Sequence, residues 1–310
     1  MRWILVFPLL CVSCSVQSNV DFVVNDEGVL FTEDGRNILF YQKAPKSFDG
    51  QYTRNDYVHP LWSMDGDTLT EDYPPDHAHH RGIFWTWHQI YVGDTRLGDA
   101  WECRDFVWDV ADVQVHDAEN GGKTLTAEVL YKSPKYVDAD GEMIAAVQEQ
   151  TRITVRPAAE DYRAIDFEIA LRALQPDVTI GGSEDRKGYG GFSARIKMPE
   201  DLRFVSRTGD VQPKTTAVDA GPWMDMVASF DGERLSGIAI LQHPTNPQPL
   251  NKWILRQKGS MQNPVFPGRE RVPLSQAKPI VLKYRLIVHR GGEGAVNVQA
   301  LFKDYIKSVK

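Results

Sequence analysis

Apolar and polar residues alternate with a period of two along much of the chain. In residues 164–172 the large apolar side chains occupy odd positions and the charged side chains occupy even positions, and residues 123–130 alternate similarly. Residues 280–288 place a further row of apolar side chains on one face. Because successive side chains of a strand point to opposite faces, this pattern predicts β-strands with one buried and one solvated face.

Other segments have the length and apolar character of strands, and turn signals rich in Gly, Asp and Asn separate several of them. These segments are residues 37–43, 83–92, 106–116, 146–156, 191–198, 224–230 and 236–243. From Val298 to Val309, by contrast, apolar side chains recur at the spacing of an amphipathic helix. Many strands without alternating helices predict an all-β fold, a single large antiparallel β-sandwich (supersandwich-like) over residues 19–310 with a C-terminal amphipathic helix.

The first 18 residues have the pattern of a signal peptide. Arg2 precedes an apolar stretch over residues 3–12, and small residues follow. Lipid attachment at Cys14 is the alternative, but Cys11 stands where a lipoprotein signal usually has an aliphatic residue. No later apolar run is long enough to span a membrane, so no transmembrane segment is expected. The protein is therefore predicted to be exported, to the periplasm or the cell surface.

Charge and cysteine content narrow the function classes. The formal net charge is −7 and the basic residues are scattered, which argues against nucleic acid as a partner. Cleavage after residue 18 would leave Cys103 as the single thiol, so no intramolecular disulfide is expected.

The densest chemistry lies in the segment Asp76-His77-Ala78-His79-His80-Arg81-Gly82. Five of the eight histidines fall between positions 59 and 88. Imidazole titrates close to neutral pH and is also the commonest metal ligand in proteins. The segment therefore predicts either a site of acid–base catalysis or a metal site.

Each residue of this segment has a predicted role. If the chain is extended here, His77 and His79 project to one side and His80 to the other. We expect His77 or His79 to act as general acid or base, with Asp76 orienting an imidazole and His80 bracing the site. Arg81 either clamps an anionic or polar substrate group or forms an ion pair that holds the loop. A divalent metal on His77 and His79 is the alternative, and it needs at least one further ligand.

Tryptophans surround the same segment, since five of the eight lie within residues 62–108. Flat aromatic rings beside hydrogen-bonding groups favour a sugar ligand, and Trp62, Trp85 and Trp87 are predicted to bind it. Spacing does not select a catalytic pair among the carboxylates, and the eligible ones are Glu71, Asp72, Asp76, Glu102, Glu184 and Asp185. The glycine-rich stretch 181–191 favours a flexible loop over a substrate lid.

Motifs further along the chain complete a family resemblance. They include residues 190–195, Gly221-Pro222-Trp223, His243-Pro-x-Asn246-Pro with Trp253 after it, and residues 288–291. Together with the histidine segment they resemble exported bacterial proteins catalogued as "methane oxygenase PmoA", over most of the chain after residue 18. The resemblance implies an association with sugar and polysaccharide breakdown. His243 is then expected to be a catalytic partner from a distant strand, with Asn246 and Trp253 binding substrate.

The sequence thus predicts an exported carbohydrate-active protein with a small carbohydrate or glycoside as its ligand. The leading hypothesis is an enzyme that uses histidine acid–base chemistry as a lyase, hydrolase or epimerase, with no cofactor required. One alternative is a metal-dependent oxygenase or hydrolase that holds Zn²⁺, copper or iron. The other is a non-catalytic glycan-binding protein. The sequence does not indicate the oligomeric state.

Overall fold

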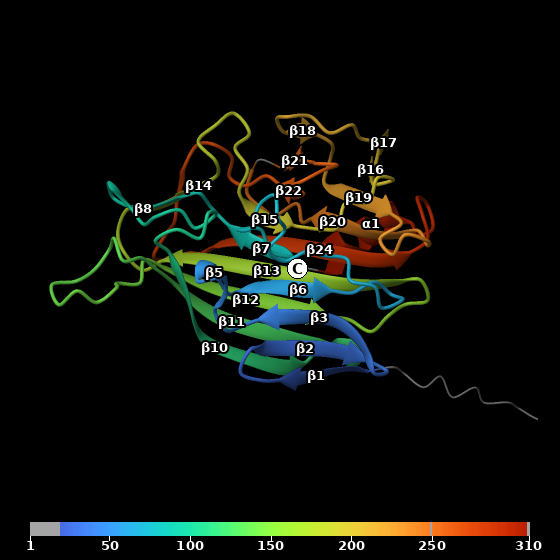
Figure 1. The fold of residues 1–310 in the computed structure, drawn as a ribbon, viewed down its shortest axis with the longest axis horizontal. Coiled ribbons are helices and arrows are strands. Elements are labelled where there is room, and N and C mark those ends of the chain that lie inside the picture. Colours follow the sequence, from blue (N-terminus) through green and yellow to red (C-terminus); the bar gives the residue numbers. More distant parts are fainter. Residues whose placement is uncertain (1–18, 249, 309–310) are drawn as a thin grey trace, which may run out of the picture.

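The computed structural model describes residues 19–248 and 250–308, which form five antiparallel sheets, a short 3₁₀ turn and one α-helix (Figure 1). The six-stranded sheet has the order β1 (Val20–Val24), β2 (Gly28–Glu33), β3 (Arg36–Gln42), β6 (Tyr57–Leu61), β7 (Ile83–Thr86) and β15 (Gly191–Ala194). The nine-stranded sheet has the order β10 (Val107–Asp117), β11 (Lys123–Lys132), β12 (Val147–Val155), β13 (Tyr162–Ala173), β24 (Ile280–Arg290), β20 (Ser236–Gln242), β19 (Trp223–Ala228), β16 (Arg203–Ser206) and β17 (Gly209–Asp210).

Three smaller sheets complete the fold. The first contains β23 (Val272–Pro273), β14 (Val178–Gly181), β8 (Gln89–Val92) and β9 (Thr95–Arg96), and the second contains β18 (Val218–Asp219), β21 (Lys252–Ile254) and β22 (Asn263–Pro264). The third is the hairpin of β4 (Lys46–Phe48) and β5 (Gln51–Arg54). The 3₁₀ turn η1 spans Glu119–Gly121 and the helix α1 spans Val298–Ser308.

The two large sheets pack face to face, which confirms the predicted antiparallel β-sandwich. Residues of both sheets, including Phe31 of β2 and Phe167 of β13, belong to one buried hydrophobic cluster. The ring of Trp85 on β7 lies 6.1 Å from that of Phe167. Strand β13 alternates buried and solvated side chains over residues 165–172, as the sequence pattern predicts.

The predicted strand over residues 83–92 is two strands in different sheets. Its first half, β7, pairs with β15, and its second half, β8, pairs with β14. Between them the indole of Trp87 is buried and its Nε1 donates to the carbonyl of Phe266, 3.0 Å away. This long-range hydrogen bond lies where the strand is interrupted. The chain passes here from the six-stranded sheet to the four-stranded sheet.

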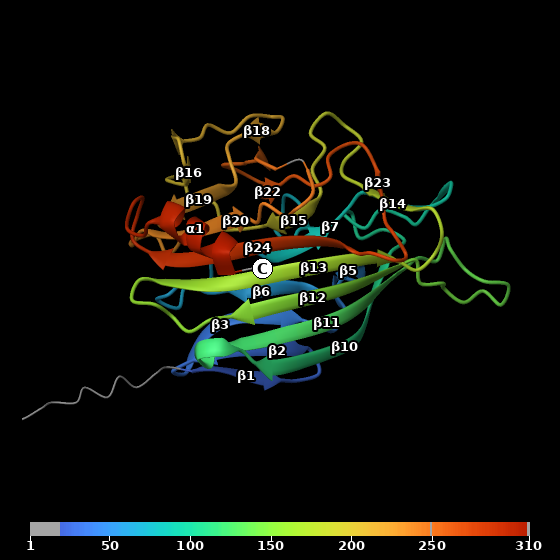
Figure 2. The same ribbon diagram turned by 180° about the vertical axis from the view of Figure 1, so that it is seen from behind.

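The C-terminal helix α1 confirms the predicted amphipathic pattern. Val298 and Tyr305 are buried and pack with Trp223 and Leu241. Figure 2 shows α1 beside β19 and β24 of the nine-stranded sheet. Val309 and the predicted signal peptide over residues 1–18 lie outside the described residues. Among the described residues, no helix has the length and hydrophobicity required to cross a membrane.

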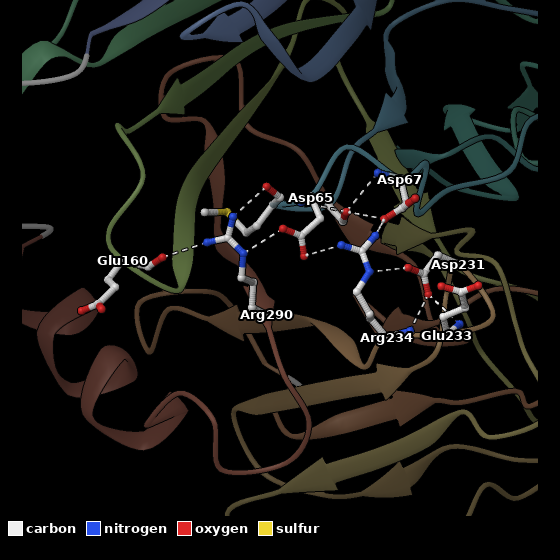
Figure 3. Close-up of polar contacts among 9 residues, drawn as sticks. Asp65, Asp67, Glu160, Asp231, Glu233, Arg234 and Arg290 are labelled. Atoms are coloured by element: carbon white, nitrogen blue, oxygen red, sulfur yellow. Dashed lines mark hydrogen bonds and ion pairs between the residues drawn. The ribbon is translucent and has the colours of Figure 1, made fainter.

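A network of ion pairs holds the start of the long loop between β6 and β7 (Figure 3). Arg290, at the end of β24, donates to Asp65 over 2.9 Å. Arg234 contacts Asp65, Asp67 and Asp231, with its Nε 2.8 Å from Asp231 Oδ2. Exposed ion pairs each contribute only about 0–1 kcal/mol, so the network positions the loop more than it stabilises the fold.

Candidate functional site

A cavity of about 250 Å³ contains the histidine cluster. It is lined by His77, His79, His80, Trp101, Glu102, Lys187, Tyr189, Ile254, Arg256, Gly259, Ser260 and Met261. These residues come from the β6–β7 loop, the turn after β9, the loop between β14 and β15, and the segment from β21 to residue 261. Other hollows in the described part of the chain measure about 290–470 Å³, but no histidine lines them. We therefore place the candidate site here on its chemistry rather than on its size.

Consecutive turns, not an extended strand, arrange the histidines. The amide of His77 donates to Pro74 and that of His80 donates to His77, over 3.1 and 2.8 Å. The rings of His77 and His80 are therefore stacked 4.7 Å apart, and the ring of His79 stands nearly perpendicular to both. The segment is therefore not extended, so the condition under which His77 and His79 would project to one side and His80 to the other is not met.

The loop ends at Gly82, where the chain passes close to the backbone of β6. A Cβ atom at this position would lie 2.1 Å from the carbonyl oxygen of Val58, so only glycine allows the loop to rejoin the sheet here.

His77 is held by a chain of charged groups. Its Nδ1 lies 2.7 Å from Asp76 Oδ2, and Arg195 binds both oxygens of Asp76 over 2.8 and 2.6 Å. Arg195 is itself buried and also donates to Glu71. Burial alone raises the pKa of Asp76, but the hydrogen bonds from Arg195 and His77 outweigh it and hold that pKa well below its ordinary value. Asp76 therefore stays ionised beside an imidazole that is about two-fifths exposed.

His79 and His80 are less suited to proton transfer. Burial, reinforced by the neighbouring histidines and arginines, lowers the pKa of His79 to about 3 and also lowers that of His80. Both rings are therefore neutral near pH 7. His79 Nδ1 lies 3.5 Å from Glu102 Oε2, whose side chain is about one-third exposed. The structure thus favours His77 over His79 as the acid–base group, and it places Glu102 on the same cavity wall as His79.

Arg81 does not line the cavity, so the structure does not place it where a substrate clamp would need it. The side chain is fully buried, and its guanidinium lies 3.6 Å from the ring centroid of Tyr73. It donates to the carbonyls of Ala78, His80 and Tyr52 and lies 3.4 Å from Asp72. This is the alternative in which Arg81 holds the loop through an ion pair. These hydrogen bonds to loop carbonyls explain why the charged guanidinium of Arg81 is buried.

The tryptophans that the sequence predicts to bind a sugar do not line the cavity. Trp85, Trp87 and Trp253 have no exposed surface, because large aromatic side chains on inward-facing positions bury the most apolar area. Trp62 lines a separate hollow of about 380 Å³. Trp101 is the tryptophan at the cavity, where it is almost fully buried beneath the more exposed ring of Tyr189, 4.8 Å away.

His243 and Asn246 also lie elsewhere. The ring of His243 contacts Tyr305 of α1 at 5.2 Å, and its Nδ1 bonds to Thr245. Asn246 exchanges two hydrogen bonds with the backbone of Lys283. The His-Pro-x-Asn-Pro motif therefore fastens a loop to β24, and neither residue lines the cavity.

The possible metal site at His77 and His79 lacks a complete ligand set. Among residues 19–248 and 250–308, no group of three or more His, Cys, Asp or Glu side chains has an arrangement that could hold a metal ion. His77 also uses Nδ1 for Asp76, which leaves only Nε2 for another partner.

Lys187, Tyr189, Arg256 and Ser260 line the cavity but were not predicted. Lys187 and Tyr189 belong to the glycine-rich loop, whose composition was the one available signal. Arg256 and Ser260 follow β21 without any local motif. Only the tertiary structure brings them to the histidines.

Comparison with known proteins identifies the family. A sequence model described as "Family of unknown function (DUF6807)" matches residues 28–303. The chain belongs to this family. This match overturns the predicted membership of the family catalogued as "methane oxygenase PmoA", which is wrong: short motifs resembled that family, whereas the match over the length of the chain is to DUF6807.

Other comparisons add no argument about activity. No curated protein matches this chain. One similar solved structure is that of a "putative mutarotase (YeaD)" from Salmonella typhimurium, with 12% identity over 88% of this chain and 92% of that chain. Its TM-score of 0.34 is too low for the likeness to support an inference about fold or function.

Proposed function

We propose that this protein is an enzyme that performs acid–base chemistry on a sugar or glycoside, with His77 as the group that transfers the proton. The observation that carries the proposal is the Arg195–Asp76–His77 chain at the wall of a cavity. An imidazole braced by an ionised carboxylate is a recurrent arrangement for general acid–base catalysis.

The hydrogen bonds of His77 support its proposed role as the proton-transferring group. Asp76 occupies Nδ1, which fixes the tautomer and leaves Nε2 as the free ring nitrogen. When Nε2 takes a proton, the carboxylate of Asp76 stabilises the imidazolium that forms. Arg195 keeps Asp76 ionised, so the proton stays on the histidine and can be returned to the substrate.

A second proton-transferring group is available in the same cavity. Glu102 has a partly exposed carboxylate, and Tyr189 contributes a hydroxyl. Lyases and epimerases remove a proton at one position and return one at another, whereas hydrolases protonate a leaving group and activate water. A pair of groups with different environments suits any of these reactions.

The lining favours a small polyhydroxylated ligand. The volume of about 250 Å³ lies below the roughly 300–1,000 Å³ of pockets for drug-sized ligands, so it suits about one sugar ring. Hydrogen-bonding side chains dominate the wall, and Tyr189 presents the aromatic surface on which the apolar face of a sugar stacks.

A panel of glycosides and free sugars, with product analysis, tests the proposal. We expect His77→Ala to reduce turnover by about 10²–10⁴-fold without unfolding the protein. The matched control is His116→Ala, an exposed histidine on β10, which should retain full activity. Full activity of His77→Ala would refute the assignment.

The same panel separates the alternatives. Activity that chelator abolishes and Zn²⁺, copper or iron restores would support a metal-dependent enzyme instead. Ligands that bind but are recovered unchanged throughout would support a non-catalytic glycan-binding protein.

A further inference from the structure

We propose that the cavity binds an anionic sugar, with Arg256 and Lys187 recognising a carboxylate or sulfate group on the ring. This inference rests on the proposed function, since it specifies the substrate class of the same site. It rests on the charged side chains of the cavity wall, and on which of them form ion pairs and which do not.

Hydrogen bonds hold the guanidinium of Arg256, but no carboxylate among the described residues forms an ion pair with it. Its Nη1 donates to the carbonyls of Lys214 and Leu255, and its Nη2 donates to that of Thr215, all over 2.8–2.9 Å. No Asp or Glu within residues 19–248 and 250–308 forms an ion pair with it. Three backbone carbonyls thus orient the guanidinium while its charge remains available.

Lys187 adds a second cation from the opposite loop. Its Nζ lies 3.0 Å from Asp185 and 5.4 Å from the ring centroid of Tyr189, and the side chain is one-third exposed. Asp185 also accepts hydrogen bonds from Ser183 and from the amide of Lys187, so it is fixed within the loop. Lys187 can therefore turn toward a ligand anion without leaving the carboxylate buried and unpaired.

The balance of charge around the cavity differs from that of the whole chain. The net charge of the protein is −7, yet the charged side chains that line the cavity are Lys187, Arg256 and the single carboxylate Glu102, and Asp185 is paired with Lys187. The nearby Asp76 is already bound by Arg195. Burial lowers the pKa of Arg256, the direction expected for a cation that is partly desolvated without a full counter-charge.

A neutral sugar would leave Arg256 without an ion-pair partner. Arg256 is partly buried, and an oxyanion of the ligand would supply the counter-ion that a partly desolvated guanidinium lacks. The planar fork of Arg256 matches the geometry of carboxylate and sulfate oxygens. The Asp76–His77 pair would then act on the ring that this anion positions.

Titration calorimetry with charge-matched ligand pairs tests the proposal. The pairs are methyl glucuronide with methyl glucoside, methyl galacturonide with methyl galactoside, and a 6-sulfated sugar with its unsulfated form. We expect the wild-type protein to bind at least one anionic member about tenfold or more tightly than its neutral partner, and the advantage to shrink at high salt. The uronide and sulfate pairs distinguish the two sources of the anion.

Variants locate the effect. Arg256→Gln combined with Lys187→Gln should bring the affinity ratio close to one, and Arg256→Lys should restore part of it. Arg203→Gln is the matched control, because Arg203 is an exposed arginine paired with Asp210 and Glu293 outside the cavity, and it should keep the full ratio. If the double variant does not fold, Lys187→Gln alone provides the test, because this side chain belongs to a loop. Its affinity ratio should then be smaller than that of the wild-type protein.

Two results would overturn the anion subsite. One is a ratio within twofold of unity for every pair, including no binding of any member. The other is an unchanged ratio in the folded double or single variant. Anionic ligands that bind selectively but are recovered unchanged would instead defeat the proposed enzymatic function and leave the subsite standing. Turnover confined to neutral sugars would instead defeat the anion subsite and leave the proposed enzymatic function standing.

Discussion

Two aspartates, Asp56 and Asp76, show how differently one side chain behaves in two regions of this molecule. Asp56 is fully buried between the large sheets, whereas the side chain of Asp76 is one-third exposed at the cavity. Burial and the neighbouring carboxyl of Glu149 raise the pKa of Asp56 well above its ordinary value, while Arg195 and His77 hold that of Asp76 well below it. Full burial dominates at Asp56, although Arg54 acts in the opposite direction, whereas at Asp76 the hydrogen bonds from Arg195 and His77 outweigh a partial burial.

The buried region is a hydrogen-bond network inside an apolar core. Tyr41 donates to Asp56 over 2.8 Å, and Glu149 accepts from Trp85 over 2.8 Å as well as from Tyr131 and Thr151. Because two adjacent buried carboxyls cannot both ionise, one of them holds a proton. The cavity region instead keeps its carboxylate charged. The core therefore raises the pKa of its carboxyl groups, whereas the cavity holds Asp76 ionised beside His77.

The sharpest test of the cavity side is Asp76→Asn. The amide cannot stabilise an imidazolium or select the same tautomer of His77, so we expect turnover to fall by roughly 10²–10⁴-fold with little change in fold. Steady-state kinetics across pH measures this loss. Asp94→Asn, at an exposed turn, is the control that should leave the rate unchanged. A rate within threefold of wild type would show that the contact between Asp76 and His77 has no catalytic role.

The core side is tested by Glu149→Ala. The change leaves the donors of Trp85, Tyr131 and Thr151 without their acceptor in the interior, so we expect the free energy of unfolding to fall by about 3 kcal/mol. Urea unfolding measures the difference. Glu168→Ala, at a solvated position of β13, should change the free energy by less than about 0.5 kcal/mol. Equal losses in the two variants would mean that the network is not a structural element.

The smallest expected effect is the opposite pH dependence of two asparagine variants. Between its unfolded pKa of about 3.9 and its raised folded pKa, Asp56 binds more protons in the folded state, so its contribution to stability is lost as pH rises. Asp76 binds fewer protons in the folded state, so its contribution is present above about pH 4 and is lost as pH falls.

Urea unfolding between about pH 3 and 7 measures both variants against wild type, because the contribution of Asp76 changes mainly below about pH 5. The stability of Asp56→Asn relative to wild type should increase with pH, whereas that of Asp76→Asn should decrease. The second change should be smaller, because solvent screens the partly exposed ion pair. Slopes of the same sign would break the comparison between the two regions.

Local patterns predicted most of the main strands because backbone geometry sets their periodicity. The alternation over residues 164–172 marks β13, and the spacing from Val298 marks α1. The strand over 83–92 was predicted as one because its residues look continuous, and the buried contact that divides it at Trp87 comes from Phe266. Periodicity reports which residues face inward, but it does not report which sheet they join.

The candidate site divides in the same way. The sequence by itself determined that three imidazoles, a carboxylate and a guanidinium lie within residues 76–82. Only the tertiary structure decided that His77 faces the cavity with Asp76 behind it, that Arg81 is buried, and that Arg256 arrives from a distant segment. The physical reason is that burial and charge pairing, which set the state of each ionisable group, depend on residues far apart in the chain.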